Sequence, residues 1–163
     1  MESEADIIVV GGGAAGCVLA ERLSIDPSLK IVVLEAGSRT FKYLHSFPLF
    51  TGHYYRKAED NWNYSTVPQA GLNGRSVFWP RGKRIGGSTI FNGMVYARGN
   101  AADYDDWSRY GVRGWTYEDV LPYFRRNERY EDGADELHGG DGMLSVTHSR
   151  AQNELFAAFI AAG

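Results

Sequence analysis

An apolar run that leads directly into three glycines constrains this chain more than any other feature. Residues Ile7–Val10 are all β-branched, and Gly11, Gly12 and Gly13 follow at once. A continuous apolar run of this kind is typical of a strand buried on both faces of a parallel sheet. The sequence therefore predicts a buried strand that ends in a tight glycine turn.

A helix and a second strand are predicted after this turn. One face of the helix repeats an apolar residue every four positions, at Ala15, Leu19 and Leu23. Asp26-Pro27 is expected to end the helix, and Ile31–Leu34 repeats the buried-strand pattern, so the segment predicts a βαβ unit. Because no third run of this kind follows within the usual distance, we expect an incomplete sheet and a piece of a longer protein.

The glycines at the turn have the spacing G-x-G-x-x-G, formed by Gly11, Gly13 and Gly16. Gly11 permits the tight turn, Gly13 lets the backbone approach a pyrophosphate, and Gly16 lets the helix pack closely on the strand. The amides near Ala14 and Ala15 then face the phosphates from the amino end of the helix. The spacing and its context predict a dinucleotide site.

A carboxylate closes the second predicted strand. Glu35 lies about twenty residues after Gly16 and is followed by Ala36, which we include in the predicted site. A carboxylate at this place is expected to accept hydrogen bonds from a ribose and to repel a 2′-phosphate, which disfavours NADP. The motif by itself leaves NAD and FAD as alternatives.

Charge and composition exclude several classes of protein. A net charge of -3 over 163 residues provides no field for nucleic acid. An acidic amino terminus and the lack of a long apolar run predict neither a signal peptide nor a membrane span, and we expect a cytoplasmic location. No metal site is predicted, because metal-ligand spacing is lacking among His45, His53, His138 and His148.

Weaker patterns predict the remaining elements. Residues 38–75 are expected to be mostly loop and 76–80 a short strand, with helices over 101–107, from Thr116 to about residue 131, and over 153–163. The stretch 138–146 is expected to be a turn and a strand. Thr116 and Asp119 form a capping-box pattern, and Pro122 is expected to kink or restart that helix. The residues predicted to be buried are Cys17, Trp107, Tyr110, Trp115, Tyr117, Tyr123 and Phe124.

A second glycine-rich block, GKRIGGSTIFNGMVYARGNAADYD, begins at Gly82. This block resembles the first signature of the glucose-methanol-choline (GMC) flavoprotein oxidoreductases. The matching positions are Gly82, Lys83, Ile85, Gly86, Gly87, Ser88, Thr89, Asn92, Gly93, Tyr96, Gly99 and Asp105. The glycine turn and the stretches DYDDW, GWTYEDVLPYF and HGGDGMLSV are also similar to this family, nearest to its choline-dehydrogenase-like members.

The resemblance implies an α/β chain with a Rossmann-like FAD-binding βαβ fold, incomplete, and with the start of the GMC substrate domain. It implies an FAD-binding part over residues 1–140 and the truncated start of the substrate domain over 141–163. In the family the second block lies along the flavin side of FAD. The residues that take this role here are Gly82, Ile85, Gly86, Gly87, Ser88, Thr89, Asn92, Gly93, Met94 and Val95.

The chemistry of the second block agrees with this role. Amides of Gly86 and Gly87 and the hydroxyls of Ser88 and Thr89 suit a phosphate or a ribityl chain, and the 92–93 pair can approach a flat ring. Phe91 departs from those relatives that carry a histidine covalently bonded to the flavin at this position. We therefore expect non-covalent FAD.

The resemblance implies an enzyme that oxidises a small-molecule alcohol. A base takes the hydroxyl proton, and hydride passes to flavin N5. In the family this base is a histidine near the carboxyl terminus, so no catalytic residue is assigned here, and the C-terminal remainder is expected as a second chain or fragment. Two alternatives stay open: lyase or photodecarboxylase chemistry on the same scaffold, and a non-catalytic FAD-binding fragment.

Overall fold

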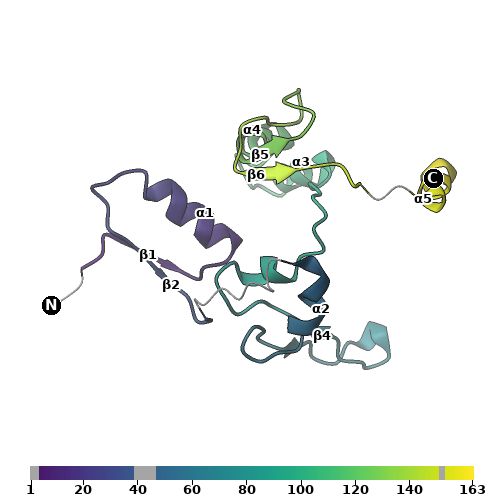
Figure 1. The fold of residues 1–163 in the computed structure, drawn as a ribbon, viewed down its shortest axis with the longest axis horizontal. Coiled ribbons are helices and arrows are strands. Elements are labelled where there is room, and N and C mark those ends of the chain that lie inside the picture. The colour runs from purple at the N-terminus through teal and green to yellow at the C-terminus, as the bar shows by residue number, and fades with distance from the viewer. Residues whose placement is uncertain (1–3, 39–46, 151–152) are drawn as a thin grey trace. The chain divides into compact units, whose positions relative to one another are not determined.

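The predicted βαβ unit is present at the amino end of the chain. In the computed structural model, which describes residues 4–38, 47–150 and 153–163, strand β1 (Ile7–Val10) is followed by helix α1 (Ala14–Leu23) and strand β2 (Ile31–Leu34). The strands are parallel, with Ile7 opposite Ile31 and Val10 opposite Leu34. Helix α1 lies along the strand pair (Figure 1). The parallel pair and its crossover helix confirm the sequence prediction.

The strand pair is covered on one face only. Val9 is buried and its side chain lies close to Gly16 of α1, whereas Val10 on the opposite face is 83% exposed. The expectation that both faces of this strand are buried is therefore wrong for the described chain, because α1 supplies a single covering layer. Leu19, on the predicted apolar face of the helix, is likewise exposed.

Helix α1 ends earlier than the sequence predicts. Its last residue is Leu23, and the amide of Ser24 still donates to the carbonyl of Ala20. The Asp26 carboxylate accepts bonds from the amide and the hydroxyl of Ser28 at 2.9 and 2.7 Å. This local turn competes with helix, because an aspartate can bond its own backbone two residues on.

The chain divides into two units, Met1–Val95 and Tyr96–Gly163, and each is described by itself. The first unit continues with short elements: η2 (Pro48–Phe50), α2 (Thr51–Tyr54), β3 (Tyr64–Ser65), η3 (Ala70–Leu72), β4 (Phe78–Trp79) and η4 (Gly87–Phe91). Strands β3 and β4 pair antiparallel, so the strand predicted at 76–80 is confirmed.

His45 lies outside the described residues. The predicted boundary after residue 140 concerns a substrate domain and stays a prediction.

A buried polar cluster joins two distant segments of the first unit. Asp60 is 0% and Arg84 2% exposed, and Arg84 Nε donates to Asp60 Oδ1 at 2.6 Å. Asn61 is also buried, and its Oδ1 accepts bonds from the amides of Asn63 and Arg81 at 3.0 and 2.9 Å. The cluster therefore fixes the start of the second glycine-rich block against residues 60–63.

The second unit contains α3 (Ala101–Arg109), α4 (Tyr117–Asn127), β5 (Glu128–Tyr130), β6 (Leu144–Val146) and α5 (Glu154–Ala162). The predicted capping box is confirmed: Thr116 Oγ1 accepts from the amide of Asp119, and Asp119 Oδ2 accepts from the amide of Thr116, at 3.2 and 3.0 Å. Helix α4 runs through Pro122 without a break, so the predicted restart is wrong. The helices predicted over 101–107 and 153–163 are confirmed.

Strand β5 was not predicted, because its residues continue the helical pattern of α4. The helix ends at Asn127 instead, and Glu128–Tyr130 pairs in parallel with β6. The buried Glu128 carboxylate explains the change: its Oε2 accepts from Arg98 Nη2 at 2.5 Å and from the amide of Gly139 at 3.0 Å. Long-range pairing thus overrides the local helical preference.

Most of the aromatic residues predicted as core are not buried. Trp107, Tyr110, Trp115 and Tyr123 are exposed, although Trp107 and Trp115 contact each other with ring centroids 5.9 Å apart. The rings of Tyr104 and Phe124 also contact each other, with centroids 5.9 Å apart. Helices α3 and α4 meet through a single layer of rings, so the outer ring faces stay in contact with solvent. A cavity of about 620 Å³ lies among them.

Among residues 4–38, 47–150 and 153–163 we find no helix with the length and hydrophobicity that crossing a bilayer requires. The cytoplasmic location stays a prediction.

We expect the substitution Arg84→Met to lower the free energy of unfolding by about 3–5 kcal/mol, because it leaves the buried Asp60 carboxylate without its cation. Urea unfolding followed by circular dichroism measures this loss. The double variant Asp60→Leu/Arg84→Met should recover most of it, and Arg113→Met, at an exposed arginine, should match the wild type. A single variant as stable as that control would contradict the assignment.

Candidate functional site

The glycine turn has the backbone conformation that its sequence predicts. Gly11 has φ +94°, a left-handed conformation that favours glycine, and its amide donates to the carbonyl of Leu34 at 2.7 Å. A Cβ placed on Gly16 would lie 2.0 Å from the carbonyl oxygen of Gly11. Ala14, Ala15 and Gly16 form the first turn of α1. The turn therefore admits no side chain at Gly16. Helix α1 begins at Ala14, directly after the turn.

The second glycine-rich block lies directly against this turn. The amide of Gly86 donates to the carbonyl of Gly12 at 2.7 Å, and Gly13 and Gly86 form an isolated parallel bridge. Gly87 has φ +55°, and a Cβ on it would lie 2.8 Å from Gly13 Cα. Two backbones separated by more than seventy residues in the chain thus touch at glycines, which is the close approach that only glycine permits.

A cavity of about 480 Å³ opens where the two blocks meet. The predicted site residues that line it are Gly11, Gly13, Glu35, Ala36, Gly82, Gly87 and Ser88. Ile85 lines a neighbouring cavity of about 760 Å³ along β2, which Glu35 and Ala36 also border. The structure therefore brings together residues from both glycine-rich blocks and from the carboxyl end of β2.

Other predicted residues lie away from this cavity. Thr89 is in η4, and its hydroxyl donates to the carbonyl of Gly86 at 2.6 Å. Asn92 caps the carboxyl end of η4. The three residues after it, Gly93, Met94 (φ +59°) and Val95, are exposed. Their predicted place beside the flavin ring stays a prediction.

Glu35 holds the edge of the cavity through backbone amides. Its Oε2 accepts from the amide of Gly12 at 2.7 Å, and its Oε1 accepts from the amide of Gly37 at 2.8 Å. The carboxylate is thereby fixed at the end of β2, next to the glycine turn. Each oxygen retains capacity for a further bond, so a ligand hydroxyl can still donate to it.

Sequence reasoning missed three side chains in the cavity wall. Trp62 and Tyr64 stack with ring centroids 5.9 Å apart and an interplanar angle of 5°, and both line the cavity together with Arg81. The available signal was the spacing of two aromatic residues two positions apart beside strand β3, which puts both on one face. Arg81 belongs to the basic cluster RGKR, residues 81–84, whose sequence alone suggests no specific partner.

Cys17 lies beside the same turn, and its predicted burial is wrong: the thiol is exposed. Its Sγ donates to the carbonyl of Gly12 at 3.3 Å. Gly16, the residue before Cys17, is the buried residue of α1.

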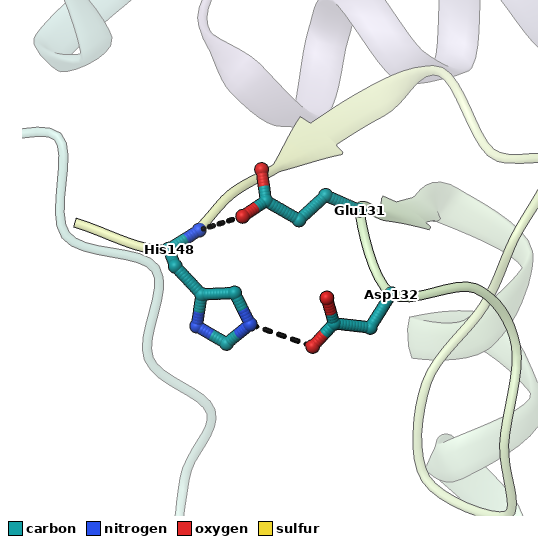
Figure 2. Close-up of side chains that lie close together, drawn as sticks. All are labelled: Glu131, Asp132 and His148. Atoms are coloured by element: carbon teal, nitrogen blue, oxygen red, sulfur yellow. Dashed lines mark hydrogen bonds and ion pairs between the residues drawn. The ribbon is translucent and has the colours of Figure 1, made fainter. Parts of the chain in front are cut away.

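A separate group in the second unit consists of Glu131, Asp132 and His148 (Figure 2). One ligand-type atom from each residue lies within 4.8 Å of the others. His148 Nε2 and Asp132 Oδ2 are 2.6 Å apart, and Glu131 Oε1 accepts from the amide of His148 at 3.0 Å. All three side chains are exposed, and these two bonds to the ring and the amide of His148 account for the arrangement without an ion. The prediction of no metal was based on the spacing of histidines, and this group has a single histidine and two carboxylates from another segment.

The hydrogen bond between His148 and Asp132 couples their protonation. It raises the pKa of His148 above its ordinary value, helped by the negative charge of the carboxylate, and it lowers the pKa of Asp132. A raised histidine pKa adds stability that is fully present below the pKa of the unfolded state and is lost as the pH rises through the folded-state pKa. Because both groups are exposed, this contribution is small.

Known proteins match this chain along nearly its whole length. The sequence profile of the GMC oxidoreductase family matches residues 5–163. The oxygen-dependent choline dehydrogenase of Vibrio vulnificus (strain YJ016) is 44% identical over 165 residues, which cover 100% of this chain and 30% of that protein. The mitochondrial choline dehydrogenase of Mus musculus is 42% identical, over 99% of this chain and 28% of that protein.

Solved structures agree with the sequence relatives. The crystal structure of pyridoxine 4-oxidase from Mesorbium loti superposes with a TM-score of 0.89 at 36% identity, covering 98% of this chain and 31% of that one. An FAD-dependent oxidoreductase from Chaetomium thermophilum gives 0.81 at 27% identity, covering 98% and 29%. The chain thus spans about 30% of the length of its relatives. It belongs to the GMC oxidoreductase family.

Proposed function

We propose that this chain forms the FAD-binding part of an enzyme that oxidises a small-molecule alcohol. The observation that carries the proposal is the meeting of the two glycine-rich blocks, Gly13 against Gly87, around a cavity that also contains Glu35. Family membership supports FAD over NAD, an alternative that the turn motif alone leaves open. The relatives named above include choline dehydrogenases and a pyridoxine 4-oxidase, and an alcohol is the substrate class that these names share.

The residues present fit FAD. A Cβ on Gly87 would lie 2.8 Å from Gly13 Cα, so the bare glycine lets the two blocks meet at the wall of the cavity that would take the diphosphate. Amides at the start of α1 supply donors and the positive end of the helix dipole. Glu35 offers its remaining lone pairs to a ribose hydroxyl, and the exposed Ser88 hydroxyl offers one further bond.

The reaction itself requires residues beyond these. Bound FAD would supply the acceptor for the hydride that leaves the alcohol carbon, and a base would take the hydroxyl proton, so that the alcohol becomes a carbonyl compound. None of the side chains assigned to the cavity is a histidine, and we propose that the base belongs to the part of the enzyme outside these 163 residues. That part, in the same or a second polypeptide, is the proposed partner of this chain.

We expect Gly87→Ala to weaken FAD binding about tenfold or more, because the added methyl group must separate Gly87 from Gly13 at a left-handed backbone position. Quenching of flavin fluorescence during titration of the protein measures the dissociation constant. Gly71→Ala is the matched control, since a Cβ at Gly71 meets open space. Equal affinities for the two variants would refute this place for the cofactor.

The phenylalanine at position 91 predicts that FAD is bound without a covalent link. Its ring contacts Tyr55, with centroids 5.4 Å apart, and a phenyl group has no atom that can form a covalent link to the flavin. Acid precipitation of the loaded protein should therefore leave all the flavin in the supernatant. A yellow pellet after washing would mean a covalent attachment elsewhere.

The substrate class is tested on the complete enzyme that contains this chain. Under anaerobic conditions, choline or pyridoxine is expected to bleach the flavin absorbance, because hydride transfer reduces the ring. Ethyltrimethylammonium, which lacks the hydroxyl of choline, is the control and should leave the spectrum unchanged. A flavin that no primary alcohol bleaches would favour lyase or photodecarboxylase chemistry.

A further inference from the structure

We propose that Arg81 is the cation that recognises the cofactor's diphosphate. This inference rests on the proposed function and adds a residue that the glycine motifs do not include. Arg81 is the one basic side chain among the described residues that line the cavity, and Glu35 is the one acidic side chain there. A ligand in this cavity therefore meets opposite charges at two separate places.

The charge balance of the cavity favours a cation beside the diphosphate. The diphosphate of FAD carries two negative charges, and Glu35 adds a third within the same cavity wall. Backbone amides at the glycine turn are neutral donors and offset only part of this repulsion. A guanidinium offsets more, because it carries a full charge and presents paired donors that match phosphate oxygens.

The backbone of Arg81 is held independently of its side chain. Its amide donates to the buried Asn61 Oδ1 at 2.9 Å, and its carbonyl accepts from the amide of Trp62, also at 2.9 Å. These bonds hold the Cα at the cavity wall. A substitution at Arg81 therefore removes the guanidinium while the bonds that place the backbone remain.

The side chain of Arg81 is exposed and available for a ligand. Nη1 donates to the carbonyl of Pro80 at 2.7 Å, and the guanidinium carbon lies 5.2 Å from the centroid of the Trp79 ring. These contacts restrict the side chain and lower the entropy lost on binding. A guanidinium has five N–H donors, so the bond to Pro80 leaves donors for phosphate oxygens.

Neighbouring cations do not fulfil this role. Arg84 is buried and pairs with Asp60, so its charge is already compensated. Lys83 has its Nζ 4.7 Å from the centroid of the Trp62 ring and does not line the cavity. Of the three basic residues in the RGKR cluster, the geometry assigns the diphosphate to Arg81.

The test compares FAD binding by the wild-type protein with that of Arg81→Gln and Arg81→Lys at low and high NaCl concentration. We expect Arg81→Gln to weaken binding about tenfold, the loss of one charge-assisted contact. Its dissociation constant should also rise less steeply with salt than that of the wild type, because one ionic contact is missing. Arg81→Lys should retain the salt dependence and part of the affinity. Arg113→Gln, at an exposed arginine of the second unit, should match the wild type.

Other outcomes of this titration separate the inference about Arg81 from the proposed function. An unchanged dissociation constant for Arg81→Gln overturns the inference while leaving the proposed function in place. Equal losses in Arg81→Gln and Arg81→Lys, with the salt dependence of the wild type, would mean that the residue acts through structure alone and would also overturn it. A wild-type protein that binds no FAD refutes the proposed function itself, and the inference with it.

Discussion

The buried ion pair between Asp60 and Arg84 is the interaction on which the candidate site depends. Both side chains are almost fully buried, and each charge offsets the other. The pair joins the segment before β3 to the start of the second glycine-rich block, and the amide of Lys83 adds a bond to the Asp60 carbonyl at 2.8 Å. The second block is thereby held where it can meet the glycine turn.

Close backbone contact then shapes the cavity. Gly86 bonds to Gly12, and Gly13 meets Gly87 with no room for a side chain between them. Such contacts bring the main chain of Gly11, Gly13 and Gly87 into the cavity wall, where backbone groups suit a phosphate because they offer donors without bulk. Among the side chains that complete the wall, Glu35 and Arg81 carry the charges.

Much of the fold was predictable, because the signals for it are local. The parallel strands, the crossover helix, the capping box at Thr116 and the helix over 101–109 all follow from periodicity or from short motifs. The errors in strand β5 and in burial have a common physical cause in long-range packing. Strand β5 replaces a predicted helical turn because Glu128 bonds to Arg98 and Gly139. Exposure of Val10 and Cys17 depends on which faces other segments cover, and no local pattern records that.

Local sequence patterns were enough to predict the βαβ unit, the glycine positions at the turn, the carboxylate at the end of the second strand and the resemblance to the GMC family. These features are properties of neighbouring residues, since backbone conformation and strand periodicity are set over a few positions. Three contacts became visible in the folded chain alone: Gly13 faces Gly87, Arg84 pairs with Asp60, and Trp62, Tyr64 and Arg81 form a cavity wall. Each of these depends on segments distant in the chain, and the close packing of such segments has no signature in local spacing.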